Sequence, residues 1–230
     1  MNITYLIGLL LSALAVITGI VVHESAHAFA AYLLGDKTAR SRGRISLNPL
    51  NHIDPFGTVL LPLLLILAGG PVFAFAKPVP VYLGNLKHPK RDEIIVSLAG
   101  PFSNILLAAL AALLLHALAT FIGIQQWWIL RYDGIELLAN FLITFMSINL
   151  SLAFFNLIPL PPLDGSSILV LLLRGEALQT YYRIQRYAMP ILIVVLYLLP
   201  QLTGIDLIGA YFNVTVYPML NGLLSLALGM

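Results

Sequence analysis

The sequence contains no cysteine and few charged residues. Without cysteine, the chain forms neither disulfides nor a metal site built from thiolates. Aspartate, glutamate, lysine and arginine together account for only 10% of the 230 residues, and the formal net charge is +2. A net charge this small gives no reason to expect a nucleic-acid partner.

Apolar residues dominate the chain: 60% of the sequence is hydrophobic and the mean hydropathy is +0.94. This composition is typical of an integral membrane protein, in which a transmembrane helix needs about 20 apolar residues. Apolar segments recur at residues 4–34, 94–122, 135–158, 186–200 and 204–228. We therefore expect an all-α integral membrane protein, a bundle of about five to six transmembrane helices in a lipid bilayer. No polar stretch is long enough to fold alone, which predicts a single domain over residues 1–230.

One further apolar segment, 57–75, is interrupted by two prolines and a Gly-Gly pair, which favours a broken or re-entrant element. If this segment re-enters without crossing, eleven of the twelve lysines and arginines fall on one side of the membrane and Arg131 alone on the other. The positive-inside rule then makes the basic side cytoplasmic and places the N-terminus outside. A full crossing would move four of these charges outward and remains the alternative.

The first apolar segment contains the motif His23-Glu24-Ser25-Ala26-His27, which is H-E-x-x-H. The i, i+4 spacing places both imidazoles on one helix face, where they can share a zinc ion, with Glu24 beside that ion as a general base. The alternative is a pair of core histidines bonded to neighbouring helices. Ionisable groups inside a bilayer cost about 2.5 kcal/mol or more and are kept mainly for function, which favours the metal site.

A catalytic zinc site uses three protein ligands and a water, so a third ligand must come from elsewhere. The best candidate is Asp164 in the stretch NLIPLPPLDG, residues 156–165. Its prolines break the preceding helix and free backbone groups, which only a protein-lined or wet cavity tolerates in a membrane. The segment 135–158 delivers Asp164 to the same end of the membrane as His23 and His27. Asp164 could also serve as the N-cap of the following short helix.

Taken together, these segments resemble the intramembrane zinc metalloproteases of the site-2 protease type. The resemblance rests on HESAH at 23–27 and NLIPLPPLDG at 156–165, and is supported by SLAGPFSN at 97–104. The stretches at 48–62 and 76–81 are similar to the compact branch that lacks PDZ and CBS domains.

The resemblance implies hydrolysis of peptide bonds within or next to transmembrane segments of other membrane proteins. It implies one Zn²⁺ per chain held by His23, His27 and Asp164, with Glu24 as catalytic acid and base. It also suggests a multi-pass protein of a prokaryotic cytoplasmic membrane, and the predicted orientation puts the active site toward the cytoplasmic side.

Other polar positions are candidates for supporting roles. A neutral donor near the metal would stabilise the developing oxyanion, and Asn104 and Asn156 are the candidates, although either could instead form an interhelical hydrogen bond. His52 and Asp54 could orient a ligand histidine, or belong to a turn at Asp54-Pro55.

Substrate docking is predicted at the stretch KPVPV, residues 77–81. The two prolines have no N–H, so an extended segment here would offer hydrogen bonds from Val79 and Val81 along one edge only. We expect a short strand that receives the unwound substrate; a proline-stiffened loop is the alternative.

Two other classes of function fit parts of the pattern. A zinc transporter would need polar groups at several depths of the membrane, whereas these cluster at one. A catalytically inactive zinc-binding scaffold would have no need of Glu24. The sequence leaves the physiological substrate and the oligomeric state open.

Overall fold

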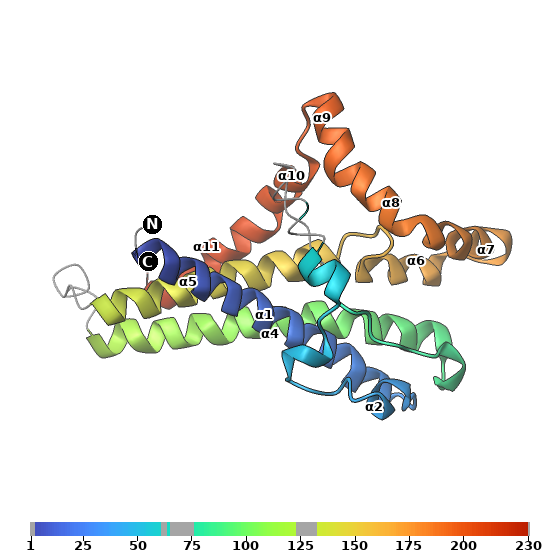
Figure 1. Cartoon of the computed structure of the whole chain (residues 1–230), viewed down its shortest axis with the longest axis horizontal. Helices are drawn as coiled ribbons and strands as arrows, with labels where there is room; N and C mark the ends of the chain where they lie inside the picture. Colours follow the sequence, from blue (N-terminus) through green and yellow to red (C-terminus); the bar gives the residue numbers. More distant parts are fainter. Residues whose placement is uncertain (1–2, 61–63, 65–75, 123–132, 230) are drawn as a thin grey trace.

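The computed structural model describes residues 3–60, 64, 76–122 and 133–229 (Figure 1). Within these residues the chain forms helices and irregular connections, and no β-strand is present. They include five stretches long and apolar enough to cross a membrane: Tyr5–Leu33, Pro89–Phe121, Gly134–Asn156, Gly175–Thr203 and Leu207–Leu228. The prediction of an all-α, multi-pass membrane protein is confirmed.

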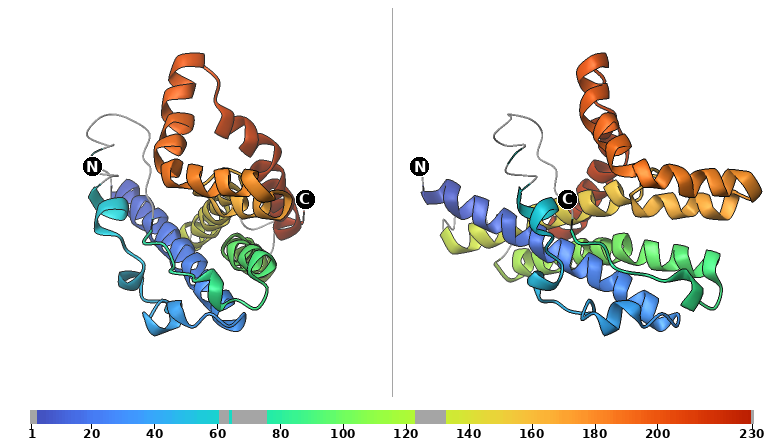
Figure 2. Two further views of the ribbon diagram at one scale, coloured as in Figure 1. Left: turned by 90° about the vertical axis from the view of Figure 1, so that its right-hand side faces the viewer. Right: turned by 45° about the vertical axis from the view of Figure 1, so that its right-hand side comes forward.

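Three long helices form the centre of the molecule: α1 (Ile3–Leu33), α4 (Pro89–Ile122) and α5 (Asp133–Asn156). They pack against one another and run side by side (Figure 1, Figure 2). Many of the buried residues in these helices are alanines, whereas large side chains such as Leu113 and Phe121 are exposed on the outside. Small residues let helix backbones approach closely in a membrane, and the exposed apolar side chains suit contact with lipid.

The helix α11 (Val216–Leu228) packs on α4 and α5. Val216 lies in one apolar cluster with Leu150, and Ala227 lies in another with Ala139. Since Ala139 precedes Leu150 in α5, α11 runs antiparallel to that helix. Its last turns therefore lie at the end of the bundle where α5 begins.

Shorter helical elements flank the long helices. Between α1 and α4 lie α2 (Thr38–Ser41), η1 (Pro49–Asn51), η2 (Pro55–Leu60) and η3 (Leu83–Asn85). After α5 come η5 (Asp164–Ser166), α6 (Ser167–Leu172), α7 (Gly175–Ile184), η6 (Gln185–Tyr187), α8 (Ala188–Ile193), η7 (Val194–Leu198), α9 (Leu199–Thr203) and α10 (Leu207–Val214). The run from α8 to α9 leans away from the three central helices (Figure 1).

The helix ends differ from the predicted limits most clearly at α4, which begins at Pro89 rather than near residue 94. Its first turn is charged, so hydropathy alone does not reveal it. The Asp92 carboxylate accepts a hydrogen bond of 2.9 Å from the His88 N–H and so satisfies a donor at the start of the helix.

Two predicted features of the connection between α1 and α4 have different outcomes. The broken or re-entrant segment 57–75 lies outside the described residues apart from its beginning in η2 and position 64. The predicted short strand at 77–81 is described, and it is an irregular connection without strand pairing.

Candidate metal centre

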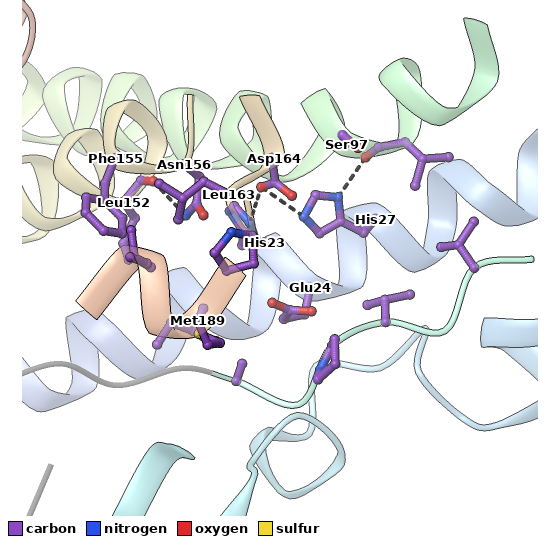
Figure 3. Close-up of a pocket in the computed structure, with 18 residues that line it drawn as sticks. His23, Glu24, His27, Ser97, Leu152, Phe155, Asn156, Leu163, Asp164 and Met189 are labelled. Atoms are coloured by element: carbon purple, nitrogen blue, oxygen red, sulfur yellow. Dashed lines mark hydrogen bonds and ion pairs between the residues drawn. The ribbon is translucent and has the colours of Figure 1, made fainter. Parts of the chain in front are cut away.

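Two histidines of α1 form the first part of the site. His23 and His27 stand one helical turn apart, with ring centroids separated by 4.6 Å and ring planes nearly perpendicular. Both are buried within a helix that is otherwise apolar enough to span a membrane. Figure 3 shows both rings directed into the same cavity. The predicted i, i+4 geometry therefore places the two imidazoles together.

Asp164 reaches this pair from the proline-rich stretch that follows α5. Its Oδ2 atom lies 3.1 Å from His23 Nε2 and 3.4 Å from His27 Nε2. Among the described residues, this is the one group of three histidine, aspartate or glutamate side chains whose possible metal-binding atoms all lie within 4.8 Å of one another. Donor atoms around a tetrahedral zinc ion with bonds of about 2.0–2.1 Å are separated by about 3.3 Å. The three side chains thus fit such an ion.

The Nδ1 atoms of both histidines have hydrogen-bond partners in the neighbouring helix α4. His23 Nδ1 lies 2.6 Å from Asn104 Oδ1, and His27 Nδ1 lies 2.7 Å from the carbonyl oxygen of Val96. Both partners are acceptors, so each Nδ1 donates its N–H to them, and each Nε2 is left to bind an ion held between the two rings and Asp164. This arrangement is the one that metal-binding histidines use to fix ring orientation and tautomer.

Glycine in α4 leaves the space into which the two Nε2 atoms point. A Cβ atom added at Gly100 would lie 2.6 Å from His23 Nε2 and closer still to His27 Nε2. Because real side chains do not approach this closely, residue 100 must be glycine for the imidazoles to hold these positions. The room between the donor atoms and the α4 backbone is a second feature that fits a bound ion.

The segment that carries Asp164 is fixed by its neighbours. A Cβ at Gly165 would lie 2.9 Å from the Ile158 carbonyl oxygen and collide with the Leu157 backbone, so the chain can fold back tightly only with glycine here. The Tyr181 hydroxyl lies 3.2 Å from the Ser166 carbonyl oxygen. No backbone N–H of the described residues donates to the Asp164 side chain, and its carboxylate faces the histidines rather than capping the next helix.

The three side chains open onto a cavity of about 470 Å³ that is walled mainly by apolar residues (Figure 3). Its lining comes from α1, the 76–81 connection, α4, α5, the Asp164 segment and α8: Ile20, His23, Glu24, His27, Ala76, Pro78, Val79, Val81, Val96, Ser97, Leu152, Phe155, Asn156, Pro162, Leu163, Asp164, Met189 and Leu192. A cavity of this size can accept several residues of an extended peptide.

Glu24 lines this cavity next to the histidines (Figure 3). Its side chain is 16% exposed, and its Oε2 atom lies 3.9 Å from Arg44 Nη2. No hydrogen bond to this carboxylate is formed by the described residues, so its oxygens remain available to a water molecule or a substrate. This is the placement that a general base requires.

The two predicted oxyanion candidates lie in different places. Asn156 lines the cavity, although its Nδ2 donates to the Leu152 carbonyl within α5. Asn104 is fully buried behind His23, and its Nδ2 donates to the Gly19 carbonyl of α1 and to Asn149 Oδ1 of α5. Asn104 therefore connects three helices and does not line the cavity.

The predicted docking residues Val79 and Val81 also line the cavity that contains His23, His27 and Asp164. Neither of their amides is hydrogen-bonded within the described part of the chain. His52 and Asp54 do not contact the ligand histidines: His52 Nε2 bonds the Ser46 carbonyl (2.7 Å), and Asp54 Oδ1 caps a turn.

Two residues of the site were not predicted. Arg44 follows Lys37, Arg40 and Arg42, a set of basic residues typical of the cytoplasmic side of a membrane protein. Nothing in the sequence indicates that Arg44 has a role different from theirs. Asn149 interrupts the apolar run of α5 together with Asn140 and Asn156, and the sequence does not show which of these three amides bonds inside the bundle. Asn149 holds Asn104, and Asn104 holds His23.

A multi-pass membrane protein whose HExxH histidines meet a distant aspartate at a cavity between its helices belongs to the class of membrane metalloproteases. Comparison with known proteins identifies the family. Residues 11–199 match the family model described as Peptidase family M50, and the chain belongs to this family, the site-2 protease family.

Relatives from two groups of bacteria carry names that agree with this family. The chain is 37% identical over 215 residues to "Putative zinc metalloprotease YwhC" of Bacillus subtilis (strain 168), covering 90% of this chain and 84% of that protein. It is 33% identical over 175 residues to "Putative zinc metalloprotease Rip2" of Mycolicibacterium smegmatis, covering 76% of this chain and 62% of that protein. A Rip2 of Mycobacterium tuberculosis is 32% identical over 183 residues, covering 80% of this chain and 64% of that protein. No solved structure matches the chain.

Proposed function

We propose that this protein is a zinc endopeptidase that cuts peptide bonds within or next to transmembrane segments of other membrane proteins. His23, His27 and Asp164 hold the zinc ion, and Glu24 is the catalytic acid and base. The observation that carries the proposal is the meeting of two imidazole Nε2 atoms and one carboxylate oxygen, 3.1 and 3.4 Å apart, beside Glu24 in a cavity between membrane-spanning helices.

The reaction assigns each group a separate task. A bound zinc ion supplies a Lewis acid that polarises the scissile carbonyl and activates the attacking water. Glu24 takes the proton from that water and passes it to the leaving amine. The Asn156 amide lines the cavity, and we assign to it the donation of a hydrogen bond to the carbonyl oxygen as negative charge develops there.

The environment of the site favours a membrane-embedded substrate. The cavity is walled by apolar side chains, among them Ile20, Phe155 and Leu192. A helical substrate hides its carbonyls in i to i−4 hydrogen bonds and must unwind before hydrolysis. The amides of Val79 and Val81, to which no described residue is hydrogen-bonded, can then hold the extended chain along the cavity wall, as an added strand would be held.

The membrane orientation follows from charge. His23 and His27 lie in the half of α1 that leads to Lys37 and Arg40, and the positive-inside rule assigns that end to the cytoplasm. We place the site toward the cytoplasmic side of a prokaryotic cytoplasmic membrane, in a protein that functions as one domain.

Zinc content and peptide cleavage by purified variants test the proposal. Wild type and Glu24→Gln should each bind one zinc per chain, but Glu24→Gln should lose about 10²–10⁴-fold in turnover of a transmembrane peptide, the usual worth of a general base. Asp164→Ala should lose zinc as well as cleavage. Glu176→Gln removes an exposed carboxylate of α7 and should leave both unchanged.

Each alternative gives a different result in the same experiment. A scaffold would bind zinc and cut none of a panel of transmembrane peptides, and Glu24→Gln would change nothing. A transporter would move zinc into vesicles irrespective of Glu24. Wild-type protein without zinc, purified in the absence of chelators, would refute the metal site itself.

A further inference from the structure

Arg44 is a buried cation next to the candidate active site. It follows the short helix α2 and Gly43, whose φ of +67° turns the chain inward, and its own N–H bonds the Ala39 carbonyl (3.0 Å). The Arg44 side chain is only 4% exposed. A buried guanidinium is costly unless it is paired, so its partners indicate its purpose.

The guanidinium joins two parts of the site that are far apart in the sequence. Nη2 donates a hydrogen bond to the Lys77 carbonyl and also lies 3.9 Å from Glu24 Oε2. The Lys77 N–H in turn donates to the His52 carbonyl (2.9 Å). Lys77 is therefore held through both of its backbone groups, directly before Pro78 and the cavity-lining valines.

The other end of this connection is anchored independently. The Tyr82 N–H donates to the fully buried carboxylate of Asp36 (2.7 Å), just after α1 ends. Hydrogen bonds therefore hold the chain on both sides of residues 78–81, from Arg44 at Lys77 and from Asp36 at Tyr82. Of these two residues, only Arg44 also forms an ion pair with the carboxylate of Glu24.

Arg44 does not itself contact a substrate in this arrangement, because it is absent from the residues that line the cavity. The separation of 3.9 Å exceeds hydrogen-bonding distance, which is about 2.7–3.2 Å for N–H to O. The ion pair therefore compensates the charge of Glu24 within the membrane domain and leaves both carboxylate oxygens free for proton transfer.

We propose that Arg44 is a positioning residue that holds the catalytic carboxylate of Glu24 and the docking residues 78–81 at a fixed distance from each other. The proposal rests on the function proposed above. The planar guanidinium has several donors in a rigid fork and can serve a carbonyl and a carboxylate at once, whereas an ammonium is a point charge on a flexible stem. A substrate strand bound at 78–81 is thereby kept in register with the general base.

Kinetics of three variants test this role. Arg44→Gln should keep one zinc per chain, lower kcat about 10–100-fold as a misplaced catalytic group does, and raise KM. Arg44→Lys keeps the charge but not the fork, so it should recover part of kcat while KM stays raised. Arg42→Gln removes an exposed arginine two residues away and serves as the matched control, with wild-type kinetics expected.

Cross-linking measures whether a peptide lies next to the docking segment 78–81, and it does not require the peptide to be cleaved. The chain has no cysteine, so Val79→Cys in the inactive Glu24→Gln background gives a single thiol. With diamide added as the two-electron oxidant, a transmembrane peptide that has one cysteine near the bond cut by wild type should form a disulfide with this thiol. Adding Arg44→Gln should reduce the yield several-fold. Adding Arg42→Gln should not reduce it.

The outcomes separate this inference from the proposed function. If wild type cuts no peptide, the proposed function fails, and this inference with it. If wild type cuts but Arg44→Gln matches Arg42→Gln in kinetics and cross-linking, only the role of Arg44 is refuted. Loss of zinc in Arg44→Gln would also refute it, since the arginine would then be supporting the metal site. If Arg44→Gln does not fold, the kcat and KM of Arg44→Lys decide in the same way.

Discussion

Asn104 of α4 lies with its Oδ1 atom 2.6 Å from Nδ1 of His23 in α1, inside a membrane-spanning bundle. The same amide is held by the Gly19 carbonyl and by Asn149 of α5. The orientation of the His23 ring is therefore set by polar contacts that connect all three central helices.

Asn104→Ala should weaken zinc binding about 10–100-fold, the usual cost of losing an outer partner of a metal ligand. The substitution leaves His23 Nδ1 without its acceptor and frees the ring to rotate. Competition for zinc with a chelator of known affinity measures the effect. Asn156→Ala is the matched control: Asn156 lines the cavity but bonds neither histidine, so that variant should keep its zinc affinity and lose turnover.

Gly100→Ala should abolish zinc binding, because the new methyl group would lie 2.6 Å from His23 Nε2 and displace both imidazoles. Metal analysis of the purified variant checks this. Gly222→Ala in α11 is the control, since a Cβ there meets no atom within 4 Å. Equal zinc content in the two variants would show that the α4 backbone does not delimit the metal site.

Val79→Pro should raise KM for a transmembrane peptide without changing zinc content, because proline removes the amide that is proposed to bind the substrate strand. Val79→Ala keeps that amide and trims only the side chain, so it should affect KM less. Steady-state cleavage of one peptide by both variants provides the comparison. An unchanged KM in Val79→Pro would rule out docking through this amide.

Asp36 makes the stability of the connection pH-dependent. Burial alone raises the pKa of Asp36, but hydrogen bonds from Asn85 and Thr38 outweigh it and hold that pKa at about 2. Since this pKa is below its value of about 3.9 in an unfolded chain, the stabilisation is complete above pH 4 and is lost as the pH falls through 2.

Asp36→Asn should therefore lower the melting temperature in detergent at pH 7, and the difference from wild type should shrink between pH 4 and pH 2. Thermal unfolding of both proteins across that range measures it, and the comparison cancels the titration of other carboxylates. A difference independent of pH would mean that the ionised form of Asp36 contributes nothing.

The main elements of the site could be predicted because each has a local cause. The i, i+4 spacing alone places His23 and His27 on one helix face, and the prolines before Asp164 alone end the preceding helix. The meeting of these elements was also predictable, since alternating spans return the chain to the same end of the membrane.

What could not be predicted depends on packing. Both asparagines lie in stretches that carry the family resemblance: Asn104 ends the stretch 97–104, and Asn156 begins the stretch 156–165 that contains Asp164. Only the packing of α4 against α1 and α5 shows that Asn104 is the one that bonds His23. In the sequence, nothing distinguishes Arg44 from Arg42. In the fold, the Arg44 side chain is buried and Arg42 is exposed.

His23 and Asp164 are 141 residues apart in the chain, which has a consequence for biosynthesis. At about 5–20 residues per second, a ribosome needs about 7–28 s to travel from one to the other. During that time the first histidines are already in the membrane, but their aspartate has not yet been made. The nascent protein therefore passes through insertion with an incomplete centre, and the proposed cleavage of its neighbours becomes possible only after its third long helix, α5, has been made.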